Sequence, residues 1–84
     1  MIFLIEYNRL QGCLVTFRVF DDAERSKAEA ARLEMELTLR RGGVNHEVVL
    51  LEAASEEALR RTHRRYFEDL KDLVKSINRP GNHR

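Results

Sequence analysis

The chain contains a single cysteine, Cys13, among its 84 residues, so no disulfide can form within it. A lone thiol is typical of a protein kept in a reducing compartment, which predicts a cytoplasmic location. The apolar opening Ile2–Ile5 ends at Glu6 and follows no basic stretch. It is too short for a signal-peptide core or a membrane span, so we expect no membrane association.

The chain also lacks an excess of one charge, because 15 basic residues stand against 14 acidic ones. With 43% hydrophobic and 35% charged residues, it is apolar enough to fold. The charges are unevenly spread: residues 21–54 hold five basic and eight acidic side chains, and residues 55–84 hold eight and five. This asymmetry can orient a partner or a second copy, but it is too mild to indicate nucleic-acid binding by itself.

The length predicts one small domain, which we place at residues 1–77, followed by a flexible tail at 78–84 that begins with Asn-Arg-Pro-Gly. A chain of this size buries only about 60–65% of the surface that it exposes when unfolded. Small domains are commonly supported by disulfides, a metal or a partner chain. No histidine pair has ligand spacing and no second cysteine exists, so we expect neither a metal nor a cofactor. Oligomerisation is the support that remains.

Alternating apolar residues and turn signals predict two strands joined by a hairpin, then a helix, a third strand and a second helix. Asp21 and Glu24 have capping-box spacing at the start of the first helix, and Gly42-Gly43 ends it. Ser55 is suited to capping the second helix. The expected elements are strands 2–7, 13–20 and 44–52 and helices 21–41 and 55–77.

This ββαβα order predicts an α+β fold with a three-stranded mixed sheet of order 2-1-3. The first strand would lie antiparallel between the other two, and a helical crossover would connect the second to the third. We expect both helices to pack on one face of this sheet. The opposite face, which would carry either residues such as Phe3 and Ile5 or the residues that alternate with them, would then be partly apolar and uncovered.

The first helix has two apolar stripes on opposite sides. The first comprises Ala23, Ser26, Ala30, Leu33 and Leu37, and we expect it to cover the sheet. The second stripe needs a cover of its own, and together with the bare sheet face it predicts a homodimer. The predicted interface residues are Ala28, Ala31, Met35 and Leu39.

The second helix carries a conspicuous basic run that supports an alternative function. Its four arginines could bind the phosphates of a nucleic acid, with Tyr66 and Phe67 stacking on bases and Lys71 and Lys75 adding charge. Each arginine, however, has an acidic residue one helical turn away, which is typical of a solvated face with ion pairs at i,i+4. The residues of this alternative site are Arg60, Arg61, Arg64 and Arg65.

A third hypothesis is a small metal-independent nuclease or toxin-like enzyme in which His63 acts as a general acid or base beside Tyr66. The serines lack an adjacent base, so no catalytic constellation supports an enzyme. We therefore expect a small cytoplasmic, non-enzymatic protein that works as a homodimer or by binding another protein.

Overall fold

The computed structural model describes residues 1–68 and confirms the α+β class. The predicted end of the domain, the tail, Lys71 and Lys75 lie outside the described residues. The elements are β1 (Ile2–Asn8), β2 (Cys13–Phe20), the 3-10 turn η1 (Asp22–Glu24), α1 (Arg25–Arg41), β3 (Glu47–Glu52), α2 (Glu56–Thr62) and the 3-10 turn η2 (Arg64–Tyr66).

The sheet has the predicted order β2-β1-β3, with β1 in the centre. Strand β1 is antiparallel to both neighbours, and Ile2 stands opposite Phe20 on one side and Glu52 on the other. The expectation of a mixed sheet is therefore wrong, since every hydrogen-bonded strand pair is antiparallel. Strands β2 and β3 do run in the same direction, but β1 separates them.

Strand β1 is apolar on both faces, and this feature organises the whole fold. Ile2 and Leu4 point to one face of the sheet and Phe3 and Ile5 to the other, and all four side chains are completely buried. Successive residues of a strand alternate between faces, so a strand with this pattern must be covered on both sides.

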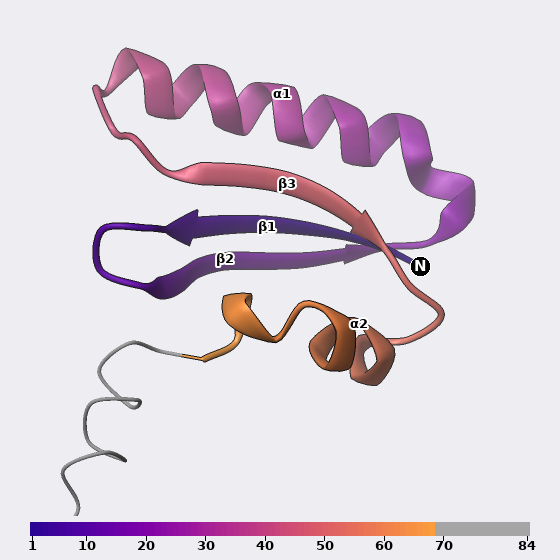
Figure 1. The fold of residues 1–84 in the computed structure, drawn as a ribbon. Coiled ribbons are helices and arrows are strands. Elements are labelled where there is room, and N and C mark those ends of the chain that lie inside the picture. Colours follow the sequence, from indigo (N-terminus) through magenta and orange to yellow (C-terminus); the bar gives the residue numbers. More distant parts are fainter. Residues whose placement is uncertain (69–84) are drawn as a thin grey trace, which may run out of the picture.

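The two helices meet that need by packing on opposite faces of the sheet, as Figure 1 shows. Helix α1 covers Ile2 and Leu4, whereas α2 and η2 cover Phe3 and Ile5. Our expectation that both helices share one face is wrong, and the apolar sheet face that it left bare is covered within the monomer. One helix on each side buries more apolar surface than two helices on one side would.

The helical segment formed by η1 and α1 begins and ends at the signals in the sequence, although its first turn is a 3-10 turn. The backbone N–H of Asp21 donates to the Glu24 carboxylate at 3.0 Å, which is one half of a capping box. At the other end, Gly43 donates to the Arg40 carbonyl at 3.1 Å and Val44 to the Leu39 carbonyl at 2.9 Å, the two bonds of a Schellman motif. Gly43 has φ of 70°, the left-handed conformation that this motif requires.

Helix α2 begins as predicted but ends much earlier than residue 77. The backbone N–H of Ala58 donates to Ser55 Oγ at 3.1 Å, which confirms the N-cap. The Thr62 hydroxyl donates to the carbonyl of Ala58 at 3.1 Å, a contact that competes with the helical ladder, and the helix ends there. The chain then tightens into η2, and Tyr66 turns onto the sheet beside Leu59.

Candidate functional site

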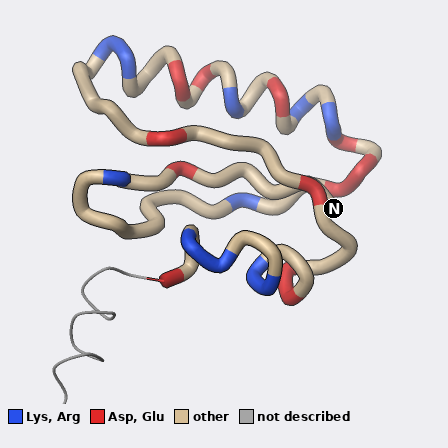
Figure 2. The backbone as a smooth tube through the Cα atoms, viewed as in Figure 1, with Lys and Arg blue, Asp and Glu red and all other residues tan. Residues whose placement is uncertain are grey.

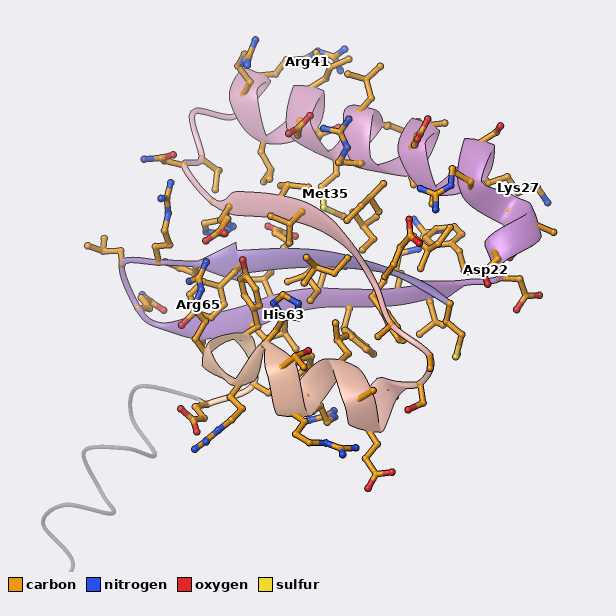
Figure 3. The ribbon with its side chains drawn as sticks, turned by 45° about the vertical axis from the view of Figure 1, so that its right-hand side comes forward. Asp22, Lys27, Met35, Arg41, His63 and Arg65 are labelled. Atoms are coloured by element: carbon orange, nitrogen blue, oxygen red, sulfur yellow. The ribbon has the colours of Figure 1, made fainter. Side chains whose placement is uncertain are left out.

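The predicted interface stripe of α1 faces the sheet rather than the solvent. Ala28 is fully buried, and Ala31 and Met35 pack against the cluster formed by Ile2, Leu4 and Phe20. Leu39, the fourth residue of the stripe, is half-buried. Figure 3 shows Met35 directed from α1 toward the sheet. The assignment of this stripe to a dimer interface is therefore wrong, because three of its four residues already pack in the core of the monomer.

The opposite stripe is the one that stays exposed. Leu33 is 54% exposed and Leu37 is 39% exposed, and Ala30 lies beside them. Together with Glu34 and Arg41 they line a shallow concavity of about 330 Å³. We call Ala30, Leu33 and Leu37 the outer stripe. Helical periodicity revealed both stripes, but it could not tell which one would meet the sheet.

The basic residues gather on α2 and η2, whereas the charges of α1 alternate in sign, as Figure 2 shows. Arg60 pairs with Glu56 at 2.8 Å and Arg64 with Glu68 at 3.3 Å, as the i,i+4 spacing predicted. Arg61 is exposed and makes no ion pair within residues 1–68. These intramolecular ion pairs neutralise the positive charge of Arg60 and Arg64, which a phosphate-binding surface would need.

Arg65 departs from the predicted row and contacts β3. Its guanidinium lies 2.8 Å from Glu47, and its centre lies 4.2 Å from the ring centroid of Tyr66. The break in the helix at His63 makes this possible, because η2 redirects Arg65 and Tyr66 toward the sheet. Arg65 therefore holds the C-terminal segment on the sheet instead of belonging to a free basic surface.

Glu47 is the centre of this polar contact, and sequence reasoning missed it. The Tyr66 hydroxyl donates to the same carboxylate oxygen at 2.6 Å as Arg65 does. Burial opposes ionisation of Glu47, but the hydrogen bonds from Tyr66 and Arg65 outweigh it and hold the pKa of this carboxyl below its ordinary value. Burial, followed by the bond to Glu47, raises the pKa of Tyr66.

His63 and Tyr66, the residues of the nuclease hypothesis, are neighbours whose ring centroids lie 6.4 Å apart. Tyr66 is only 6% exposed, and its hydroxyl is bonded to Glu47 and Arg65. A general acid or base must reach the substrate proton that it transfers. The geometry gives Tyr66 a structural role, which removes the second member of the proposed catalytic pair.

A second polar cluster lies on the α1 side of the sheet. Glu6 on β1 is 7% exposed, and it is the only charged residue that is buried among those described. One carboxylate oxygen accepts the Thr16 hydroxyl at 2.7 Å, and the other lies 2.6 Å from His46 Nδ1. The alternation of each strand contained this signal, since Glu6 follows Ile2 and Leu4 on one face and His46 precedes Val48 and Leu50.

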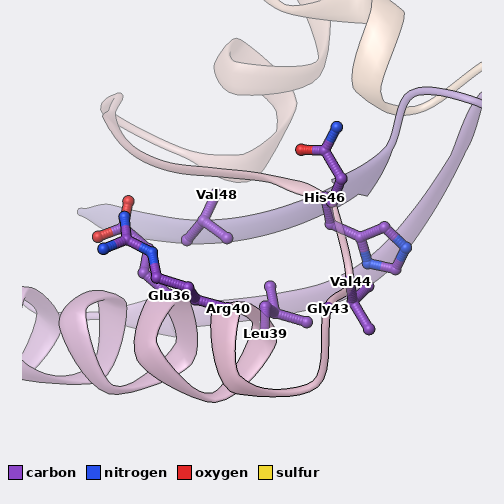
Figure 4. Close-up of a pocket in the computed structure, with 8 residues that line it drawn as sticks. Glu36, Leu39, Arg40, Gly43, Val44, His46 and Val48 are labelled. Carbon is purple, nitrogen blue, oxygen red and sulfur yellow. The ribbon is translucent and has the colours of Figure 1, made fainter.

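His46 borders two open concavities at this end of the molecule. The first, about 370 Å³, lies between the C-terminal end of α1 and the start of β3, and we call it the α1–β3 pocket. Figure 4 shows Arg40 and Glu36 at one end of it and His46 and Val44 at the other. The second, about 480 Å³, adjoins the β1–β2 turn and includes Arg9.

Comparisons with protein-family models, curated proteins and solved structures found no match to this chain. None of the helices within residues 1–68 is long and apolar enough to cross a membrane. In the same range, no group of three or more histidine, cysteine or acidic residues is arranged to hold a metal ion. Function must therefore be argued from the geometry of the chain itself.

Proposed function

We propose that this protein is a non-enzymatic cytoplasmic interaction module that works as a homodimer through the outer stripe of α1. The observation that carries the proposal is the exposure of Leu33 and Leu37 on the face of α1 directly opposite its core face. Contiguous apolar residues framed by charged ones are typical of protein interfaces. The single thiol, Cys13, which is only partly buried, suits a reducing compartment.

A second copy of the chain fits the outer stripe because the stripe is complementary to itself. In a two-fold interface, residue i of one copy meets residue j of the other, and the reverse contact is made as well. An antiparallel pairing of two α1 helices sets Leu33 against Leu37 of the second copy. It also brings the positive end of the stripe, at Arg41, toward Glu34 of the second copy, twice by symmetry.

The size of the chain supports the same proposal. Residues 1–68 form a small core with one helix on each face of the sheet. The single cysteine cannot form a disulfide within the chain, so we expect the free energy of unfolding of the monomer to be small. Burying four leucine side chains at a two-fold interface adds apolar burial worth on the order of 1 kcal/mol for each, since these side chains are already partly covered.

Analytical ultracentrifugation of the wild-type chain and of Leu33→Glu tests this proposal. We expect a concentration-dependent dimer for the wild type and a folded monomer for the variant, because Leu33 is exposed and its replacement leaves the core intact. Val15→Glu is the matched control: Val15 is 48% exposed on edge strand β2, away from the outer stripe. We expect this variant to dimerise normally.

Three results would contradict the proposal. The wild type could remain monomeric at high micromolar concentration, or Leu33→Glu could dimerise as well as the wild type. Alternatively, Val15→Glu could be the variant that dissociates, in which case pairing through the open edge of β2 forms the interface. The charge contact is tested separately: Glu34→Arg and Arg41→Glu should each weaken the dimer, and the double variant should recover affinity.

A further inference from the structure

We propose that the α1–β3 pocket binds a small organic anion, with His46 as the residue that contacts the acidic group. This site is separate from the outer stripe. The first argument is the position of Glu6, which is a carboxylate in the core of a very small domain. Burying such a group costs several kcal/mol unless hydrogen bonds compensate it. In this chain two contacts compensate it: the Thr16 hydroxyl donates to one carboxylate oxygen at 2.7 Å, and His46 Nδ1 lies 2.6 Å from the other.

The Glu6 contact orients His46. An ionised carboxylate can only accept hydrogen bonds, so the nitrogen that faces Glu6, Nδ1, carries a proton and donates it. The opposite ring nitrogen, Nε2, makes no hydrogen bond with any residue from 1 to 68. When Nε2 is also protonated, the ring is an imidazolium that donates to Glu6 on one side and to a bound anion on the other.

The charges around the pocket favour an anion over a cation. Glu36, the acidic residue in its wall, is paired with Arg32 at 3.0 Å. Arg40 lines the pocket and has no acidic partner within residues 1–68. The nearby Glu47 is bonded to Arg65 on the other face of the sheet. Arg40 therefore provides a positive charge that the protein itself does not compensate.

The size and lining of the pocket favour a small ligand with an apolar body. Its volume of about 370 Å³ falls at the lower end of the range of about 300–1,000 Å³ that is typical of small-molecule sites. Leu39 and Val48 contribute apolar side chains between the polar residues at its two ends, and Val44 adds another beside His46. A carboxylate on an aromatic or aliphatic body matches this arrangement better than a bare inorganic ion does.

Nuclear magnetic resonance of the histidine side chains provides a direct test, with benzoate, acetate and inorganic phosphate as probes. We expect the imidazole signals of His46 to shift saturably with benzoate, whereas those of His63 stay unchanged. Benzoate should bind more tightly than acetate, because only benzoate reaches the apolar side chains. Absence of a saturable shift of His46 with all three probes would overturn the proposal.

Substitutions at His46, Arg40 and Glu6 test the role of each residue in benzoate binding. His46→Gln and Arg40→Gln should each weaken benzoate binding about tenfold or more, which corresponds to the loss of one charge-assisted hydrogen bond. His63→Gln is the matched control and should bind like the wild type. Benzoate binding that survives His46→Gln, or that His63→Gln lowers equally, would contradict the assignment. Glu6→Gln should alter the ring-nitrogen signals of His46 even without ligand, which identifies Glu6 as a positioning residue.

Discussion

The hydroxyl of Tyr66 in η2 donates to the carboxylate of Glu47 in β3 at 2.6 Å, which joins two residues that are 19 positions apart. Arg65 donates to the same oxygen at 2.8 Å, and the ring of Tyr7 meets Tyr66 edge to face with 5.3 Å between centroids. This contact holds the segment after α2 against the sheet. The segment reaches this position because the helix ends at Thr62 and the chain continues into η2.

Removing the Tyr66 hydroxyl should destabilise the fold. We expect Tyr66→Phe to lower the free energy of unfolding by about 1–3 kcal/mol, because the Glu47 carboxylate loses a donor in a partly buried position. Urea denaturation measures the change. Tyr7→Phe is the control: Tyr7 is equally buried, and its hydroxyl bonds to no residue within the described range. An equal loss in both variants would contradict a specific role for the Tyr66–Glu47 bond.

The lowered pKa of Glu47 predicts how stability depends on acid. In the folded protein the Glu47 carboxylate stays ionised at pH values below its ordinary pKa of 4.5. As the pH falls, Glu47 therefore takes up a proton in the unfolded chain before it does so in the folded protein. The stabilisation from Glu47 is therefore complete above about pH 4.5 and is lost as the pH falls through the folded-state pKa. The urea midpoints of the wild type and Glu47→Gln should therefore converge as the pH decreases below about 4.5. A constant difference would contradict the assignment.

Two adjacent glycines provide a matched test of the end of α1. Gly43 has φ of 70°, whereas Gly42 has φ of −83° and room for a methyl group at ordinary contact distances. We expect Gly43→Ala to cost about 1 kcal/mol, since an L-residue is strained in the left-handed conformation. Gly42→Ala should leave stability within about 0.5 kcal/mol of the wild type. Thermal melting followed by circular dichroism distinguishes the two, and the reverse order would contradict the Schellman motif.

The orientation of α1 can be tested with one substitution at two nearby positions. Ala28 is fully buried against the sheet, and Ala30 is exposed on the outer stripe. Ala28→Gln should destabilise the fold by about 2–4 kcal/mol, because it overpacks the core and buries an amide. Ala30→Gln should retain the stability of the monomer within about 0.5 kcal/mol. If Ala30→Gln is the more damaging variant, the helix faces the sheet with its other stripe.

The order of the elements and the ends of α1 could be predicted because they depend on neighbouring residues. Each signal involves only residues close together in the sequence. These signals are the apolar residues of β1, the Asp21–Glu24 spacing and the glycines after Arg41. The strand order 2-1-3 followed from the hairpin and the connection to β3. The pairing of Arg60 with Glu56 was equally local.

The tertiary structure alone decided which surfaces are buried. Periodicity defines two stripes on α1, but the choice between Met35 and Leu33 as core depends on which stripe meets the sheet. The placement of α2 on the opposite face depends on β1, whose Phe3 and Ile5 need their own cover. Glu6 with His46 and Glu47 with Tyr66 are brought together across 40 and 19 positions, and alternation places each side chain on a face of its strand without fixing which residue it meets. The sequence by itself determined the order of the elements and the limits of the first helical segment, whereas the early end of α2, burial and polar pairing depended on packing between the elements.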